Sequence, residues 1–199
     1  KLPPLHSMNA IVAHWDVAYA GSSTSDFNAV KIWGRHRNNF WLIDGFVKQS
    51  KMKLAVEWMC QKQLEFMKEG VAVFWQFEAQ FWNDELRRIL EETESELNVR
   101  LNIVQVERST MAKLIRLLTM HPYYQNGRIH VNEELKSNPD IMTGLKQLYA
   151  VEPGMTEHDD SPDADEQAIK KLELYTEAPS GDTGKKPFKV GRMKMRFKW

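Results

Sequence analysis

The sequence predicts an α/β protein built on a mixed sheet of about five strands, the first three antiparallel and the later ones parallel, with helices on its faces. In roughly the first quarter of the chain, three segments rich in strand-forming residues follow one another with only short turns between them, which is typical of an antiparallel meander. From residue 54 onward, helical patterns alternate with short apolar segments, as they do where helices connect parallel strands.

The meander begins with a run of apolar and strand-forming residues that predicts a buried strand ending near Asp16. Polar turns at 21–26 and 35–39 separate it from the next two strands. The three predicted strands cover residues 9–19, 28–34 and 40–48.

The second part of the chain begins with a helix predicted at 54–68 and ended by Gly70. The apolar run 71–77 shows no polar alternation, so it favours a strand buried on both faces, with Glu78 at its end. The further predicted elements are a helix at 83–96, a strand at 101–106, a helix at 111–120 stopped by His121-Pro122, a short strand at 128–131, and helices at 139–149 and from about Ala164 to Tyr175.

Length and composition indicate one globular domain: the chain has 199 residues, of which 42% are hydrophobic and 27% charged. No apolar run is long enough to cross a membrane. The only cysteine, Cys60, excludes an internal disulfide and lies in a helical pattern, so we expect a packed residue rather than a nucleophile.

The domain boundaries follow from the composition at the two ends of the chain. We expect residues 1–8 to be a linker from a missing N-terminal part, 9–178 to form the compact domain, and 179–199 to be a basic tail. The tail combines seven Lys and Arg residues with aromatic residues, which suits either contact with nucleic acid or a solvated terminus.

Acidic residues mark a candidate site. Asp16 and Glu78 each end a predicted buried strand, and if those strands are parallel neighbours, both side chains emerge at the same edge of the sheet. The stretch 157–164 adds a histidine and three aspartates, His158, Asp159, Asp160 and Asp163. Aspartates this close repel one another unless water or a cation screens them, so the stretch is either a solvated acidic loop or part of a divalent-metal site.

The residue types in this cluster favour particular metals. Carboxylates are hard oxygen ligands that suit Mg²⁺ or Mn²⁺. Two such ions held about 3.5–4 Å apart activate water and stabilise the leaving oxygen in phosphodiester hydrolysis. The sequence therefore predicts a site for two Mg²⁺ or Mn²⁺ ions, provided that the fold brings these carboxylates together.

Three motifs carry a resemblance to a known family. They are Trp15-Asp16-Val17-Ala18, with the glycine-serine turn and Ser25-Asp26-Phe27-Asn28-Ala29 after it; the strand end Gln76-Phe77-Glu78; and His158-Asp159-Asp160-Ser161-Pro162-Asp163-Ala164. They resemble the C-terminal nuclease domain of the large terminase subunit of tailed bacteriophages. That domain has the ribonuclease H-like fold, shared with Holliday-junction resolvases of the RuvC type. The resemblance covers roughly Asn9 to Tyr175.

The resemblance implies a metal-dependent endonuclease that cuts concatemeric viral DNA in the host cytoplasm during genome packaging. Its implied partners are double-stranded DNA and, in the full protein, the terminase small subunit and the portal, with the isolated domain a monomer. By carry-over, Asp16 bridges the metals, Glu78 is the second ligand, and Asp160 or Asp163 is the third.

Further roles in the site are also implied only by the resemblance. Asp159 would hold a metal-bound water. His158 would position water or assist proton transfer, or is a surface histidine in a polar loop. The candidate DNA contacts are Lys31, Arg35, Arg37, Lys113, Arg116, Arg128 and the basic tail.

The sequence departs from the family in two places. Position 78 is Glu where many members have Asp, and Asp165 and Glu166 stand where apolar helix residues are expected, which predicts a less well packed last helix. The chain also contains no G-x-x-x-x-G-K-[ST] motif, so we expect no ATP hydrolysis by this chain alone.

Two other functions fit the same features. One is a RuvC-type nuclease that acts as a dimer on branched DNA. The other is a non-catalytic domain that binds DNA or a portal component through exposed aromatic residues, for which the candidates are Trp33, Trp41, Trp75 and Trp82.

Overall fold

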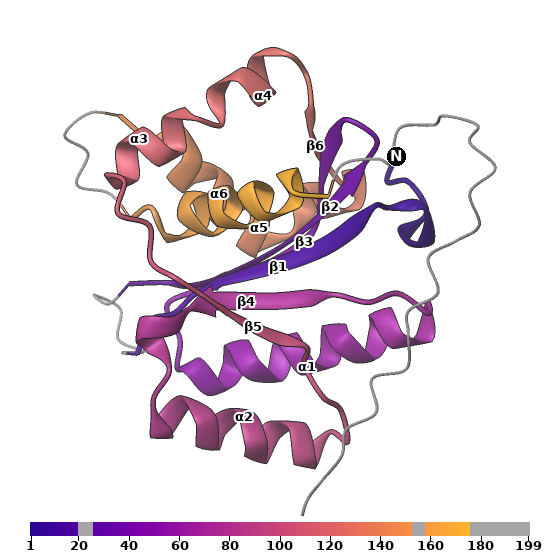
Figure 1. Ribbon diagram of the computed structural model, residues 1–199, viewed down its shortest axis with the longest axis vertical. Helices are drawn as coiled ribbons and strands as arrows, with labels where there is room; N and C mark the ends of the chain where they lie inside the picture. Colours follow the sequence, from indigo (N-terminus) through magenta and orange to yellow (C-terminus); the bar gives the residue numbers. More distant parts are fainter. Residues whose placement is uncertain (20–25, 153–157, 176–199) are drawn as a thin grey trace, which may run out of the picture.

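The computed structural model describes residues 1–19, 26–152 and 158–175, and its centre is a six-stranded sheet in the order β5-β4-β1-β2-β3-β6 (Figure 1). The strands are β1 (Ala10–Asp16), β2 (Asn28–His36), β3 (Asn39–Lys48), β4 (Phe74–Glu78), β5 (Ile103–Val106) and β6 (Ile129–Val131). The predicted mixed sheet is confirmed, and the short segment near residue 130 supplies the sixth strand.

The pairing of the strands follows the prediction. β1, β2 and β3 form an antiparallel meander, in which Asp16 lies opposite Ala29. β4 is parallel to β1, and β5 is parallel to β4. A helical crossover precedes both β4 and β5, as is usual for strands that join a sheet in parallel. β6 adds to the other edge, parallel to β3.

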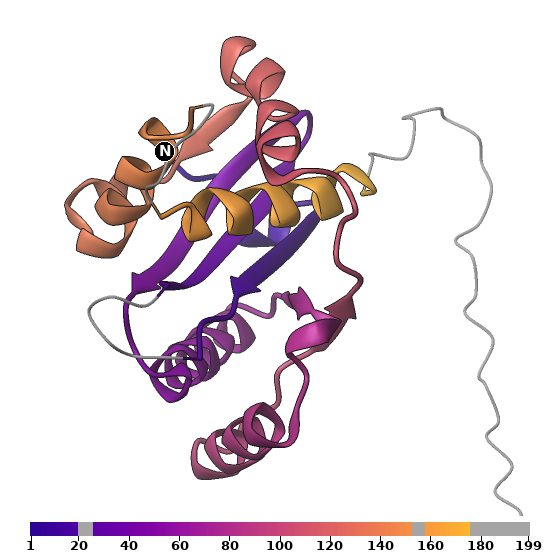
Figure 2. The same ribbon diagram turned by 90° about the vertical axis from the view of Figure 1, so that its left-hand side faces the viewer.

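Helices cover both faces of the sheet (Figures 1 and 2). One face carries α1 (Met52–Lys68) and α2 (Asp84–Glu96), and the other carries α3 (Lys113–Leu118), α4 (His121–Gln125), α5 (Pro139–Tyr149) and α6 (Asp160–Glu173). Short 3-10 turns lie at Leu5–Ser7, Ala79–Phe81 and Glu133–Ser137. Each face has its own apolar core, and α6 contacts both β1 and β2.

The start of α6 differs from the sequence-based expectation. The helix begins at Asp160, not near Ala164, so Asp160 and Asp163 both belong to its first turn. Pro162 is compatible with this earlier start because the first N–H groups of a helix have no partner within it, so the missing N–H of proline costs nothing there. Pro122 is tolerated in the first turn of α4 for the same reason. The His121-Pro122 pair therefore begins a new helix as well as ending α3.

The expected loose packing of the last helix is wrong. Asp165 and Glu166 are only 4% and 3% exposed, and both have partners in the interior. The Asp165 carboxylate accepts a hydrogen bond of 2.6 Å from the indole of Trp33 and lies 3.5 Å from the ammonium of Lys31. Buried charges are tolerated when they are paired and hydrogen-bonded, so α6 packs closely despite its acidic sequence.

The N-terminal segment is part of the packed structure. Leu2, Leu5 and Met8, in the segment expected to be a linker, pack against the core on the α1 side. The basic tail at 179–199 lies outside the described residues. None of the described helices is long and apolar enough to cross a membrane.

Cys60 is fully buried in α1, and burial raises the pKa of its thiol to about 12. The thiol therefore stays protonated at neutral pH, which agrees with a packing role.

The buried pair of Lys31 and Asp165 leads to a prediction about stability. Lys31→Met should lower the free energy of unfolding by about 3–5 kcal/mol, because it leaves the Asp165 carboxylate buried without its cation. The double variant Lys31→Met/Asp165→Leu should recover part of that loss, since no buried charge then remains. Urea unfolding of the three proteins measures this.

The matched control is Lys53→Met, because Lys53 makes only half-exposed ion pairs with Glu57 and Glu96. Its effect should stay within about 1 kcal/mol. Equal losses for Lys31→Met and Lys53→Met would contradict the structural role of the buried pair.

Candidate active site at the carboxyl ends of the parallel strands

The carboxyl ends of β1 and β4 open into a cleft of about 1180 Å³. Because β1 and β4 are parallel neighbours, Asp16 and Glu78 emerge at the same edge of the sheet, as the sequence predicted. The first turn of α6 lies beside them, so Asp160 and Asp163 line the same cleft. Four acids from three distant parts of the chain therefore meet in one place.

A fifth acid, Asp26, also lines this cleft. Asp26 lies in the first of the three motifs but is not among the ligands predicted from the sequence. Its position in the sequence could have indicated its place in the cleft. Asp26 lies just before β2, and the antiparallel pairing places the start of β2 opposite the end of β1, where Asp16 lies.

The electrostatics of Asp16 reflect this crowding. Burial raises its pKa well above the usual value, and the negative charges of Asp163, Asp160 and Glu78 raise it further. Lys113 opposes this shift but does not cancel it. The environment therefore penalises the ionised form of Asp16, which an additional cation would stabilise.

The pKa values of Glu78 and Asp160 are raised as well. Burial is the main cause that raises the pKa of each side chain, and for Glu78 the charge of Asp163 is the next. For Asp160, a hydrogen bond of 3.1 Å from the backbone N–H of Phe27 acts in the opposite direction. Gln80 donates a hydrogen bond of 2.7 Å to Glu78, which orients that carboxylate.

The side chains that line the cleft are suited to bind divalent cations. The donors are carboxylate oxygens, they line one cleft, and their mutual repulsion is only partly compensated by nearby basic groups. Hard cations such as Mg²⁺ and Mn²⁺ prefer such oxygens, so the donor set fits the predicted metals.

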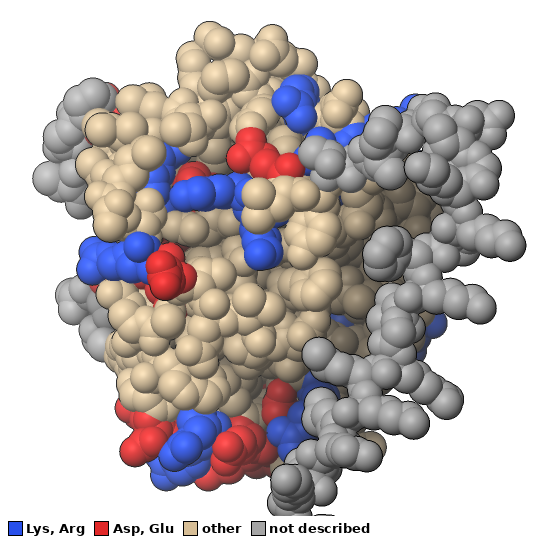
Figure 3. Space-filling view, viewed as in Figure 1, with Lys and Arg blue, Asp and Glu red and all other residues tan. Residues whose placement is uncertain are grey.

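The basic groups of the site come mainly from α3. Arg116 lies 2.6 Å from Asp163 and 2.7 Å from Glu166, and it is only 6% exposed. Lys113 lies 2.7 Å from Asp159 and 3.4 Å from Asp163. Figure 3 shows acidic and basic side chains interleaved over α3 and α6. These pairs attach α3 to α6 and hold Asp163 in place.

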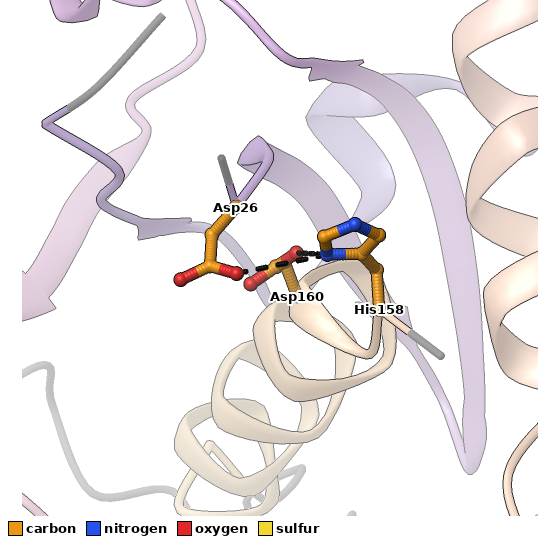
Figure 4. A group of neighbouring side chains, drawn as sticks. All are labelled: Asp26, His158 and Asp160. Carbon is orange, nitrogen blue, oxygen red and sulfur yellow. Dashed lines mark ion pairs between the residues drawn. The ribbon is translucent and has the colours of Figure 1, made fainter. Parts of the chain in front are cut away.

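Asp159 and His158 are not among the residues that line the cleft. The Asp159 carboxylate accepts the hydrogen bond from Lys113, so it helps to place that cation. His158 packs edge-on against the ring of Phe27, with ring centroids 5.0 Å apart, and its Nδ1 faces Asp26 and Asp160 (Figure 4).

Besides Arg116, two of the expected DNA contacts are buried. Lys31 is 1% exposed and pairs with Asp165. Arg35 is 7% exposed, and its guanidinium donates hydrogen bonds of 3.2 and 3.1 Å to the carbonyls of Leu172 and Glu173 at the end of α6. Burial removes both from the surface available to DNA, and gives each a role in holding α6.

Arg37 and Arg128 lie at the far end of the sheet, near the start of β1, about 20 Å from Asp16 by the rise of the strand. Arg128 donates to the carbonyl of Asn38 and stacks over Tyr123, 4.8 Å from the ring centroid. Arg37 is exposed and has a positive φ of 55°. Neither residue belongs to the acidic cleft.

Sequence reasoning missed two residues near the cleft. Arg108 is exposed, lines the cleft and lowers the pKa of Glu78; its signal is its place just after β5, at the same edge of the sheet. His14 is buried on β1 two residues before Asp16, and burial lowers its pKa to about 4, so it is neutral at pH 7.

The aromatic residues proposed for partner binding are mostly in the core. Trp33 and Trp75 are buried, and Trp41 stacks on His130 with ring centroids 4.3 Å apart. Trp82 is 39% exposed and stacks on Phe77. Of the four proposed tryptophans, only Trp82 is therefore among the exposed residues.

Comparison with known proteins gives a family match and a fold match. The model of the family described as "Terminase RNaseH-like domain" matches residues 13–172. No curated protein matches the chain in sequence.

Three similar solved structures are of the human cytomegalovirus terminase nuclease domain. The first has a TM-score of 0.63 at 13% identity and covers 82% of this chain and 83% of that one. An Mn-soaked, inhibitor-bound form has a TM-score of 0.58 at 12% identity, covering 82% of each chain. An Mn-soaked form has a TM-score of 0.53 at 14% identity, covering 84% and 85%. At these identities the likeness concerns the fold.

The raised pKa of Asp16 leads to a prediction about pH and metal. Between the ordinary carboxyl pKa and the raised one, the folded state binds more protons than the unfolded chain, so the stability of the metal-free protein should fall as pH rises. Asp16→Asn should reduce this fall, making the variant about 1–3 kcal/mol more stable than the wild type at neutral pH, with no difference near pH 4.

Urea unfolding in EDTA across this pH range measures the difference, and Glu91→Gln, on the exposed side of α2, is the control. Added Mn²⁺ should stabilise the wild type more than Asp16→Asn, because metal binds the folded site. A variant less stable than the wild type at pH 7 in EDTA would contradict the prediction.

Proposed function

The chain belongs to the family of terminase ribonuclease H-like domains, as its three motifs indicated, and we propose that it is an endonuclease that cuts double-stranded DNA with two divalent ions, Mg²⁺ or Mn²⁺. The observation that carries this proposal is the convergence of Asp16, Glu78, Asp160 and Asp163 in one open cleft. Such convergence of partly buried acids is costly, and it is useful where cations bind.

The four carboxylates would hold the ions. Asp16 stands at the end of the central strand β1 and interacts with the charges of the other three acids, which supports its role as the shared ligand. Among the acids, Asp163 contributes most to raising the pKa values of Asp16 and Glu78. Asp160 lies next to Asp26 and His158. We therefore include Asp160 and Asp163 together as ligands. The chemistry that bound ions supply is Lewis acidity toward the phosphodiester and the attacking water.

The contribution of the chain is to hold these carboxylates in place before substrate arrives. Gln80 orients Glu78, the N–H of Phe27 orients Asp160, and Arg116 orients Asp163. Each of these three acids thus has its own partner, and such preorganisation reduces the reorganisation that the reaction requires.

The groups best placed to touch the DNA backbone are Arg108 and Lys113. Arg108 is exposed at the mouth of the cleft, and Lys113 is partly exposed beside the acids. Their positive charges would hold phosphates over the acidic edge and offset its repulsion of DNA. Arg116 is too deeply buried to share this role and serves to position Asp163.

In the virus, we infer that this domain cuts concatemeric genomes during packaging, in the host cytoplasm, together with the small terminase subunit and the portal. This context rests on family membership and on the resemblance to the bacteriophage proteins.

Cutting of supercoiled plasmid tests the proposal. The wild type should nick the plasmid with Mn²⁺ or Mg²⁺ and not in EDTA, and Asp16→Asn should lower the rate at least about 100-fold, because it removes the ligand that both ions would share. Glu91→Gln, far from the cleft on α2, should cut at the wild-type rate.

Cutting by Asp16→Asn at the wild-type rate, or cutting in EDTA, would overturn the metal mechanism. A folded wild type that binds duplex DNA but cuts it with neither metal would instead favour a binding domain.

Lys113→Ala tests the DNA contact. In Ca²⁺, the affinity for a short duplex should fall, and the slope of log K against log salt should decrease by about 1, as for one lost phosphate contact. The same measurement on Arg37→Ala examines the sequence-based prediction for the far end of the sheet. If only Lys113→Ala lowers the affinity and the slope, the duplex is confined to the cleft. If both variants lower them, the duplex extends along the sheet. An unchanged slope for Lys113→Ala would contradict our proposal.

A further inference from the structure

We propose that Asp26, His158 and Asp160 form a separate binding site for a divalent transition-metal ion at the rim of the acidic cleft. The three side chains come from two separate parts of the chain: Asp26 precedes β2, whereas His158 and Asp160 lie at the start of α6 (Figure 4). One ligand atom of each residue lies within 4.8 Å of the other two.

The distances fit an ion between the side chains. His158 Nδ1 lies 3.6 Å from an Asp26 carboxylate oxygen and 3.7 Å from an Asp160 oxygen. Both distances exceed the hydrogen-bond range of about 2.7–3.2 Å. Ligand atoms arranged tetrahedrally at about 2.1 Å from an ion lie about 3.4 Å apart, which is close to the observed spacing.

The surroundings fix two of the three ligands. The Asp160 residue is 8% exposed, and one of its carboxylate oxygens accepts the N–H of Phe27. The imidazole of His158 rests against the ring of Phe27, which limits its rotation. Asp26 has an exposed side chain, so it can adjust to an ion that enters from solvent.

Among the residues that the structure describes, no lysine or arginine lies within ion-pair distance of Asp26 or Asp160. Lys113 pairs with Asp159 and Asp163, and Arg116 pairs with Asp163 and Glu166. A metal ion bound between these side chains would therefore be the nearest positive charge to Asp26 and Asp160.

The ligand types decide which metals suit the site. One imidazole nitrogen with two carboxylates favours Zn²⁺, Co²⁺ or Mn²⁺ over Mg²⁺, which strongly prefers oxygen ligands. The four acids of the main cleft provide only oxygen. The two sites therefore differ in metal preference while sharing Asp160, and this site stands on its own geometry, independently of the proposed nuclease activity.

Binding of Co²⁺ tests the proposal, because its visible absorption reports nitrogen ligation and needs no catalytic turnover. The measurement uses the full chain with Asp16→Asn and Glu78→Gln, which weakens the main site. This protein should bind one Co²⁺ ion, and Zn²⁺ should displace it. Adding His158→Ala or Asp26→Asn should weaken binding at least about 10-fold, with loss of the nitrogen-dependent band for His158→Ala.

Two controls separate binding from folding. His121→Ala removes an exposed histidine elsewhere and should leave Co²⁺ binding unchanged. Asp26→Asn changes a side chain that is 78% exposed, so its thermal unfolding without metal should match the parent protein. Equal Co²⁺ affinity in the parent, His158→Ala and Asp26→Asn proteins would overturn the proposal.

The Co²⁺-binding test and the plasmid-cutting test can fail independently of each other. Co²⁺ binding that depends on His158 in a protein that cuts no DNA would support this site while the nuclease proposal fails. Metal-dependent cutting with no His158-dependent Co²⁺ binding would overturn this site alone.

Discussion

The placement of α6 across β1 and β2 is the constraint on which the candidate site depends. Buried ion pairs help to set it, since Asp165 contacts Lys31 and Trp33 while Glu166 contacts Arg116. Such pairs are directional, and each is costly to separate inside the protein. They fix the rotation of the helix, and thereby direct Asp160 and Asp163 toward Asp16.

The opposing cost is repulsion among the acids. Burial and neighbouring negative charge raise the pKa values of Asp16, Glu78 and Asp160 together, so the fold holds these groups where they are least stable as ions. The packing of six strands and two apolar cores offsets this cost. Bound cations would reduce this repulsion, in keeping with the metal-dependent chemistry that we propose.

Basic residues illustrate how much depends on position. Lys31, Arg35, Arg116 and Arg128 hold the structure together through internal contacts, whereas Arg108 and Lys113 face the cleft. In the sequence, a lysine on a strand looks the same whether it faces solvent or a buried aspartate two elements away. Only the three-dimensional partners distinguish a structural cation from one available to DNA.

The sequence by itself determined the mixed sheet, the helices on its faces, and the positions of Asp16 and Glu78 at strand ends, because apolar periodicity and strand ends are local features. That β1 and β4 are parallel neighbours, and so bring the two acids together, is a property of the tertiary structure. The sequence also identified the acidic stretch around Asp160. Tertiary structure alone decided where α6 starts, why Asp165 and Glu166 pack well, and that Asp26 and Arg108 join the site. The physical reason is that a charged residue's role depends on burial and on partners distant in the chain, which no local pattern encodes.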